Sequence, residues 1–320
     1  MPPRSPLPAR AGEPGPRRIG LGLAALGRPG YLNLGHGEAL GEDRSPAALE
    51  RRAHAVLDAA YAGGVRYFDA ARSYGRGEEF LGAWLGERDP AGVVVGSKWG
   101  YVYTADWEVA ADPPEVKHHD VDTFRRQLEE TRANLGDRLA LYQIHSATPD
   151  SGVLEDDAVL GALAALRAEG VAIGLTTSGT SQAQTLERAL ELDLFDTAQV
   201  TWNLHERAAG AALRRAHGAG MGTIVKEALA NGRLATRGAS PALDRVADRL
   251  GAAPDAVALA AVLAQPFVDV VLSGAATVGA LRSNVHAAEL ELDAGTLGEL
   301  DALEERSDGY WAARGELAWN

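Results

Sequence analysis

The sequence predicts a single-domain α/β protein whose core is a (β/α)8 barrel built from eight strand–helix units. Short runs rich in Val, Ile, Leu and aromatic residues predict strands at 19–26, 65–69, 93–98, 139–145, 171–175, 198–202, 222–226 and 268–272. Amphipathic stretches between them predict helices at 45–62, 121–134, 156–169, 181–192 and 207–219. Strands that alternate with helices form a parallel sheet, and eight such units close a barrel.

Start signals support two of the predicted helices. Ser45 and Pro46 stand where an N-cap and a first helical residue belong, and Ser181 with Gln184 three residues later forms a capping-box pattern. The competing architecture is an open doubly wound sheet, which requires a glycine fingerprint after its first strand. The glycines found there do not have this spacing: they are Gly20, Gly22 and Gly27.

The chain divides into a tail and a barrel. Residues 1–18 are rich in Pro, Arg and Gly, lack the apolar core of a secretory signal, and are expected to be disordered. Residues 19–320 are expected to form the barrel together with a C-terminal substrate loop. Long loops are expected at 28–44, 99–119 and 228–241, and with the chain end at 308–320 they are expected to border the mouth of the barrel, where the active sites of such folds lie.

Composition and charge narrow the range of partners. A formal net charge of −13 opposes extended contact with nucleic acid or anionic lipid, and no apolar run is long enough to span a bilayer. The absence of Cys excludes disulfides, thiolate catalysis and Cys-ligated zinc. No metal site is expected, because His118 and His119 are adjacent in a loop without a third placed ligand. We therefore expect a cytoplasmic protein that binds small molecules; the sequence indicates no oligomeric state.

Polar residues follow three of the predicted strands. Asp69 and Tyr74 come after the second strand, Lys98 ends the third, and His145 ends the fourth. The carboxyl ends of barrel strands meet at one mouth, so these side chains are expected to converge. A positive neighbour lowers the pKa of a phenol, which would make Tyr74 a usable acid. Asp69 would orient Lys98, and His145 would bond the substrate oxygen.

Lysine is scarce in this sequence. Only three of the 31 basic residues are Lys, and two of them, Lys98 and Lys226, end predicted strands. An ammonium at such a position has a role that a guanidinium does not fill. One alternative function is therefore a Schiff-base lyase, in which Lys98 or Lys226 would form an imine with a substrate carbonyl.

The stretch from Gly64 to Gly75, Gly-Val-Arg-Tyr-Phe-Asp-Ala-Ala-Arg-Ser-Tyr-Gly, resembles the signature of the aldo-keto reductase family, with Ala70 in place of a common Thr. The blocks Gly-Ser-Lys-Trp-Gly around Lys98 and Leu-Tyr-Gln-Ile-His ending at His145 are similar to the next two blocks of that family. The resemblance to the family covers about residues 19–305. The sequence also resembles the sugar dehydrogenase branch of the family, but less closely. It implies a nicotinamide-dependent oxidoreductase whose catalytic residues are Asp69, Tyr74, Lys98 and His145.

The resemblance also implies cofactor-binding residues. Gln199 would meet the nicotinamide carboxamide, Trp202 would stack on its ring, and Lys226 would pair with phosphate. Arg282 would clamp a 2′-phosphate, so NADP(H) is preferred over NAD(H), which stays open. The remaining positions that match the family's cofactor blocks are Thr176, Thr177, Gly274 and Asn284.

Aromatic residues in the loops predict the substrate pocket. Trp99, Tyr101 and Trp311 are expected to form its walls, which would suit a small carbonyl compound or a sugar. The expected reaction interconverts a carbonyl and an alcohol by hydride transfer, with Tyr74 as general acid or base. Three alternatives remain: the sugar (aldose) 1-dehydrogenase direction, the Schiff-base lyase, and a cofactor-sensing protein without catalysis.

Overall fold

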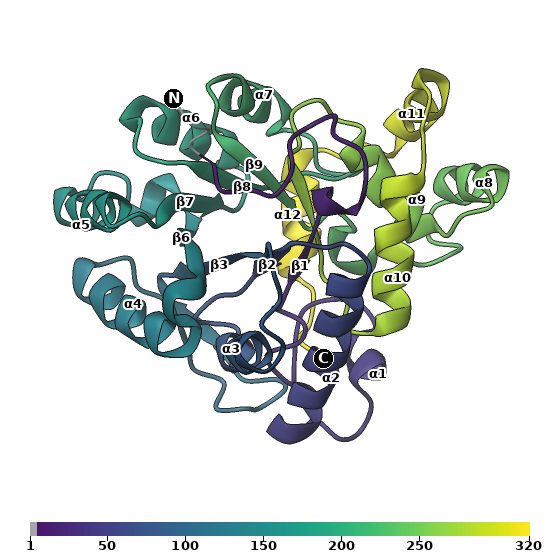
Figure 1. The fold of residues 1–320 in the computed structure, drawn as a ribbon. Helices are drawn as coiled ribbons and strands as arrows, with labels where there is room; N and C mark the ends of the chain where they lie inside the picture. The colour runs from purple at the N-terminus through teal and green to yellow at the C-terminus, as the bar shows by residue number, and fades with distance from the viewer. Residues whose placement is uncertain (1–4) are drawn as a thin grey trace.

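The computed structural model describes residues 5–320 and contains a closed parallel barrel of eight strands (Figure 1). Around the barrel the strands follow the order β1-β10-β9-β8-β7-β6-β3-β2, which confirms the predicted fold class. Their bounds are β1 Ile19–Gly22, β2 Tyr67–Asp69, β3 Val94–Trp99, β6 Leu139–Ala147, β7 Ala172–Thr177, β8 Thr197–Thr201, β9 Gly222–Lys226 and β10 Val270–Ser273.

Helices cover the outside of the barrel and, in the case of the last helix, its mouth. They are α1 His36–Leu40, α2 Pro46–Ala62, α3 Gly77–Arg88, α4 Val121–Leu135, α5 Asp157–Ala168, α6 Gln182–Leu192, α7 Gly210–Gly218, α8 Pro241–Leu250, α9 Pro254–Leu263, α10 Val278–His286, α11 Ala294–Leu300 and α12 Ser307–Gly315. Short 3-10 helices span Pro16–Arg18, Gly136–Arg138, Pro149–Ser151, Ala230–Gly232, Ala287–Glu289 and Asp301–Leu303. The Ser45 hydroxyl caps α2 as expected, whereas Ser181 stands at the N-cap of α6 without a side-chain bond.

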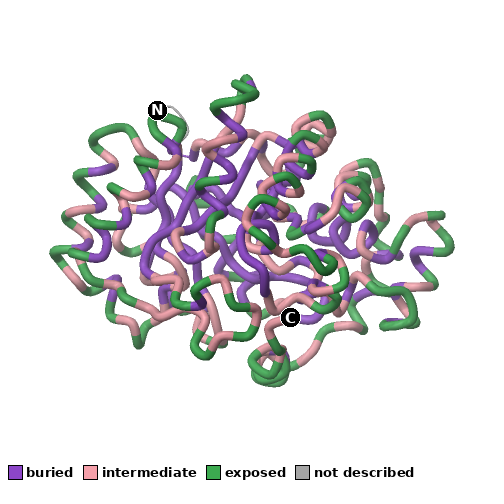
Figure 2. Tube along the Cα trace, turned by 90° about the horizontal axis from the view of Figure 1, so that it is seen from below, coloured by how far each residue is buried: buried purple, intermediate pink, exposed green. Residues whose placement is uncertain are grey.

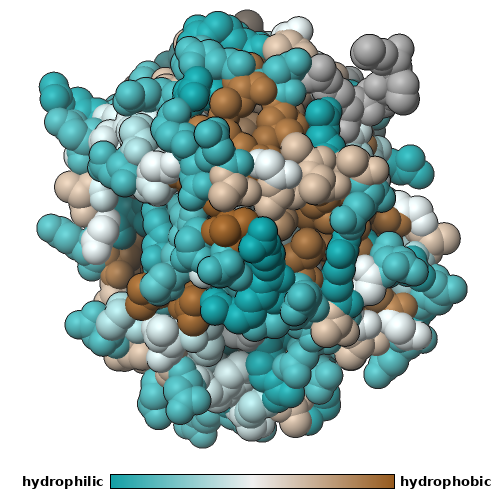
Figure 3. Space-filling view, turned by 90° about the vertical axis from the view of Figure 1, so that its left-hand side faces the viewer, coloured by the Kyte–Doolittle hydropathy of each residue, from teal (hydrophilic) through white to brown (hydrophobic). Residues whose placement is uncertain are grey.

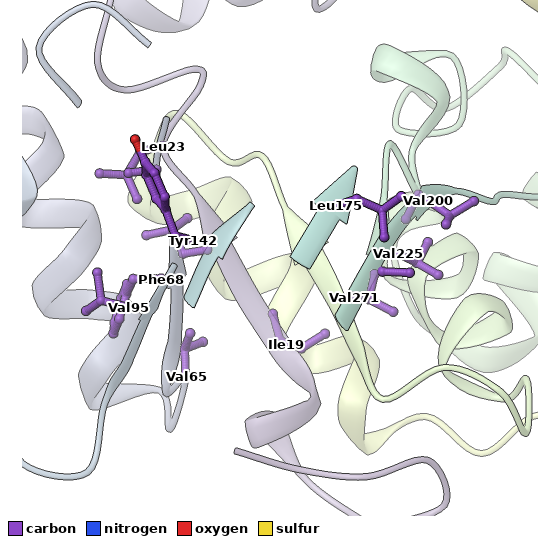
Figure 4. Packing of buried hydrophobic residues seen from close by; sticks show 14 of the residues in the cluster. Ile19, Leu23, Val65, Phe68, Val95, Tyr142, Leu175, Val200, Val225 and Val271 are labelled. Carbon is purple, nitrogen blue, oxygen red and sulfur yellow. The ribbon is translucent and has the colours of Figure 1, made fainter. Parts of the chain in front are cut away.

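Successive residues of each strand face opposite sides of the barrel wall. One set, which includes Phe68, Val95, Tyr142, Val200 and Val225, packs against the helices in the main hydrophobic cluster (Figure 4). The residues between them face the inside of the barrel. Figure 2 shows the result, with buried strands inside a shell of helices whose outer faces are exposed.

The tail packs against the barrel, in contrast to the expected disorder. Leu7 joins the cluster that fills the lower barrel with Tyr67, Leu141, Ile224 and Val270. Arg18 donates to the carbonyl oxygens of Leu263 and Val268 at 2.8 and 2.6 Å. The expectation is therefore wrong for residues 5–18, because Leu7 and Arg18 make contacts with barrel residues that are distant in the sequence. Residues 1–4 lie outside the described residues.

The loop after β3 contains a hairpin that the sequence did not predict. Its strands are β4 Tyr101–Tyr103 and β5 Glu115–Lys117, which pair antiparallel. At the other end of the chain, α12 lies over the middle of the barrel in Figure 1. Residues of both segments line the same cavity, among them Tyr101 and Glu115 of the hairpin and Arg314 of α12.

The surface of the protein contains both hydrophobic and hydrophilic residues. Figure 3 shows a face on which several small hydrophobic areas lie among hydrophilic residues. Within residues 5–320, none of the helices combines the length and the apolar character needed to cross a bilayer.

The tail contact predicts a measurable stability effect. Substituting Leu7→Ala removes buried methyl groups from the lower barrel and should reduce the free energy of unfolding by about 2 kcal/mol. Urea denaturation monitored by circular dichroism measures this difference. Arg17→Ala, at an exposed tail position, is the matched control and should leave stability unchanged. Equal stability of the two variants would show that the tail does not contribute to the core.

Candidate active site

A cavity of about 550 Å³ opens at the carboxyl ends of the strands. It reaches from the tetrad, the name used here for Asp69, Tyr74, Lys98 and His145, to residues of α10 such as Ala280 and Asn284. The expected loops border it, together with the chain end. Its walls include Gly22, Arg28, Tyr31, Asn33, His36, Asp69, Tyr74, Tyr101, Glu115, His145, Ser178, Gln199, Lys226, Glu227, Asn231, Asp255, Gly274, Ala276, Ala280, Asn284, Arg314 and Trp319.

Asp69 and Lys98 form a fully buried ion pair at the floor of this cavity. The ammonium of Lys98 donates to Asp69 Oδ2 and to the carbonyl oxygen of Ala70. The second carboxylate oxygen, Oδ1, accepts from three neutral donors: Tyr67 Oη at 2.9 Å, Gln199 Nε2 at 3.1 Å and Gln143 Nε2 at 3.2 Å. A buried carboxylate is tolerable only when its lone pairs are satisfied in this way.

Two glycines make room for this polar layer. A Cβ at Gly96 would lie 2.5 Å from Tyr67 Oη, and one at Gly174 would lie 2.8 Å from Cγ of Gln143. Either methyl group would displace a donor to Asp69. The absence of side chains on β3 and β7 at this level is therefore part of the site.

Tyr74 lies directly over the ion pair. Lys98 Nζ donates to Tyr74 Oη at 3.2 Å and lies 4.7 Å from the ring centroid. Burial, followed by the nearby Asp69 charge, raises the pKa of Tyr74 well above its ordinary value of 10. The sequence argument considered only the lysine and expected a lowered pKa; burial dominates instead, so the free phenol is protonated.

His145 faces Tyr74 edge to face, with the ring centroids 5.5 Å apart. Its Nδ1 lies 3.4 Å from the hydroxyl of Ser73. Burial and the charges of Lys98 and Lys226 lower the pKa of His145 well below 6.5, so the imidazole is neutral. A neutral ring with Nδ1 engaged leaves Nε2 available to a substrate oxygen.

An aromatic cage around Arg28 forms one wall that the sequence did not identify. The guanidinium lies 4.4 Å from the Trp319 ring and 4.8 Å from the Tyr31 ring, and it pairs with Glu115 at 2.9 Å. Tyr101 lines the cavity as expected and packs 4.9 Å from His145. The cage joins residues almost 300 positions apart, so no local pattern reveals it.

A half-buried ion pair fastens α12 to the barrel mouth. Arg314 Nη2 and Nε bond Glu227 Oε1 at 2.5 and 3.0 Å, and Glu227 adopts a left-handed backbone with φ 55°. Burial opposes ionisation, but the Arg314 and Lys226 charges lower the pKa of Glu227 to about 2. Asn203 adds to the joint by donating to the Glu227 carbonyl and to Tyr310 Oη.

Lys226 ends β9 and lines the cavity, as expected. Within residues 5–320 its ammonium makes no hydrogen bond or ion pair, in contrast to Lys98. Burial lowers the pKa of Lys226 to about 8. A half-buried ammonium that is unpaired within the described residues is a suitable partner for an anionic group of a ligand.

Three predicted aromatic positions do not line the cavity. Trp202 packs on Phe267 in the main hydrophobic cluster, with ring centroids 5.8 Å apart, and Trp99 packs on Phe124. Because side chains alternate, Trp202 faces away from the side of Gln199, and Trp99 away from the side of Lys98. Trp311 packs beside Tyr310 in the cluster under α8 and α12. The expectations of nicotinamide stacking by Trp202 and of pocket walls at Trp99 and Trp311 are therefore corrected.

Only some of the positions expected to hold a cofactor line the cavity. Gln199, Gly274 and Asn284 line the cavity. Thr176 instead accepts from the backbone of Ser146 at 2.7 Å, and Thr177 is buried without a partner for its hydroxyl, while the next residue, Ser178, lines the cavity. Arg282 is exposed on α10 and does not line it, so the basis for preferring NADP(H) is not supported.

Known proteins share both sequence and fold with this chain. Over 205 residues it is 31% identical to a D-threo-aldose 1-dehydrogenase of a Pseudomonas species, covering 58% of this chain and 60% of that enzyme, about three fifths of its length. A protein of Pseudomonas aeruginosa assigned as an aldo-keto reductase has a TM-score of 0.63 at 29% identity, covering 85% and 89% of the two chains. The glycerol dehydrogenase of Gluconobacter oxydans, at 21% identity, a TM-score of 0.69 and coverages of 89% and 90%, shares the fold.

A family model described as the Aldo/keto reductase family matches residues 18–305. The match includes every strand of the barrel and the four residues Asp69, Tyr74, Lys98 and His145. The chain belongs to the aldo/keto reductase family.

Proposed function

We propose that this chain interconverts a carbonyl and an alcohol on a small substrate, using Tyr74 as the proton-transferring group. The observation that carries the proposal is the contact of Lys98 Nζ with Tyr74 Oη at 3.2 Å, with Asp69 behind the lysine and His145 beside the phenol. These groups lie at the floor of a cavity of about 550 Å³, which is within the usual size range of small-molecule and cofactor sites.

The cavity residues fit a nicotinamide dinucleotide, which when bound would supply or accept the hydride. Gln199 and Ser178 offer an amide and a hydroxyl near the tetrad for the carboxamide. Lys226, unpaired within the described residues, offers a cation to the pyrophosphate. Gly274 and Asn284 border the opposite end, where the adenosine would lie.

Residues of the chain itself carry out the proton transfer. In carbonyl reduction the phenol of Tyr74 donates its proton to the substrate oxygen, and His145 Nε2 holds that oxygen by a hydrogen bond. Lys98 stabilises the phenolate that remains, and Asp69 keeps the lysine in place. The raised pKa of Tyr74 supports reduction at neutral pH, because the phenol already carries its proton. The reverse, aldose 1-dehydrogenase direction stays the alternative.

The walls near Tyr74 suit a small hydroxylated carbonyl compound or a sugar. Aromatic edges from Tyr31 and Trp319 can pack on the apolar face of a sugar ring, and the Arg28–Glu115 pair can bond hydroxyl groups. The likeness to a D-threo-aldose 1-dehydrogenase supports the same substrate class.

The structure argues against one of the two lysines that the Schiff-base alternative could use. Lys98 is fully buried and ion-paired with Asp69, which opposes attack on a carbonyl. Lys226 remains free for it, so borohydride reduction with a candidate aldehyde, followed by mass spectrometry, distinguishes the two functions. Trapping on Lys226 without nicotinamide would favour the lyase.

Substituting Tyr74→Phe should lower kcat/KM for carbonyl reduction by about 10²- to 10⁴-fold, because the proton donor is lost, while the Kd for the nucleotide stays within about twofold. Steady-state kinetics and fluorescence titration measure the two quantities. Tyr103→Phe is the matched control, because it also removes a tyrosine hydroxyl but Tyr103 does not line the cavity. Wild-type protein that binds nucleotide but turns over no carbonyl would instead favour the cofactor-sensing alternative.

Lys226 predicts a pH dependence of nucleotide binding. Below pH 8 its ammonium is charged and attracts the pyrophosphate; above pH 8 it is neutral, so the affinity for NADH should fall by about tenfold between pH 7 and pH 9. Lys226→Arg should remove the dependence, because a guanidinium stays charged, and Lys226→Met should bind weakly at both pH values. A wild-type Kd that is constant over this range would refute the assigned role.

A further inference from the structure

We propose that the adenosine end of the cavity selects NAD(H) over NADP(H), and that Asp255 is the residue that makes this choice. The inference rests on the proposed function, since it requires a dinucleotide in the cavity. It reverses the preference that the sequence suggested through Arg282.

Asp255 is fixed at the far end of the cavity. It stands at the start of α9 and lines the cavity beside Ala276, Ala280 and Asn284. Its Oδ1 accepts from Ser283 Oγ at 2.8 Å and its Oδ2 accepts from Asn284 Nδ2 at 2.9 Å. Both donors belong to α10, so the carboxylate is held against that helix and cannot swing away from a ligand.

The cations that line the cavity lie at its other end. The Arg28 guanidinium lies 5.3 Å from the ring centroid of Tyr74, and Arg314 is paired with Glu227. Lys226 lies close enough to Lys98 and Asp69 for their charges to affect its pKa. Among the described residues, no Lys or Arg side chain forms an ion pair or hydrogen bond with Asp255, whose hydrogen-bond partners are the neutral side chains of Ser283 and Asn284.

Neither His36 nor Arg282 changes this charge balance. His36 lines the cavity, but burial lowers its pKa to about 4, so its ring is neutral. Arg282 is exposed on α10 and lies outside the cavity wall. The N-terminus of α10 offers only about half a positive charge, which is less than the full negative charge of Asp255.

This environment separates the two nucleotides. A 2′-phosphate would bring close to two negative charges beside a fixed carboxylate and would find no guanidinium to pair with. A free ribose 2′-hydroxyl can instead donate a hydrogen bond to that carboxylate, which is how acidic residues recognise NAD in other dinucleotide sites. The small side chains of Ala276 and Ala280 leave the carboxylate accessible to the ribose.

The test is a fluorescence titration of the full chain with NADH and with NADPH, at pH 7 and fixed ionic strength. We expect NADH to bind at least about tenfold more tightly than NADPH. Ala280→Arg places a cation on the same wall and should tighten NADPH by about tenfold with little change for NADH. Asp255→Asn should narrow the difference between the two nucleotides, and thermal unfolding checks that this variant is folded.

Arg282→Ala is the discriminating control. If Arg282 does not reach the nucleotide, both Kd values stay unchanged in this variant. Tighter binding of NADPH by the wild type, abolished in Arg282→Ala, would overturn the inference and restore the preference for NADP(H). Absence of binding by both nucleotides would overturn the proposed function itself, and the inference with it.

Discussion

The Asp69–Lys98 ion pair is the interaction on which the rest of the site depends. Removing two charges from water is costly, and the pair is tolerable because three neutral donors satisfy the remaining carboxylate oxygen. Those donors come from β2, β6 and β8, so the pair can form only when the barrel has closed. Loss of one partner would leave an uncompensated buried charge, at a cost of about 3–5 kcal/mol. Fold and chemistry therefore share one constraint.

Charge is distributed unevenly along the cavity: cations lie near Tyr74, and a carboxylate lies at the end where Asp255 stands. The end near Tyr74 combines cations with the aromatic cage and a protonated phenol, where the proposed reduction would develop negative charge on a substrate oxygen. The far end presents Asp255 among alanines. In the proposed function, the cavity would stabilise negative charge at the reacting atoms and disfavour it at the ribose.

The mouth is completed by contacts between distant parts of the chain. Arg314 joins α12 to Glu227, while Asn320 bonds Gly37 through its side chain and exchanges backbone hydrogen bonds with Tyr31. Asn231 bonds Asn33 across the cavity at 3.1 Å. These contacts hold the loop after β1, the loop after β9 and the chain end as one rim, which shields the tetrad from bulk water.

The sequence by itself determined the barrel and singled out Asp69, Tyr74, Lys98 and His145, which the structure brings together, because strand–helix alternation and polar residues near strand ends are local patterns. It failed at Trp99 and Trp202, since a single position along a strand reverses the side of the wall that a side chain faces. It also failed at Arg282, whose helix face, and hence access to the cavity, is set by packing. Only the tertiary structure decided the pKa of Tyr74, the cage around Arg28 and the place of Asp255, because burial and contacts over hundreds of residues exist only in the folded chain.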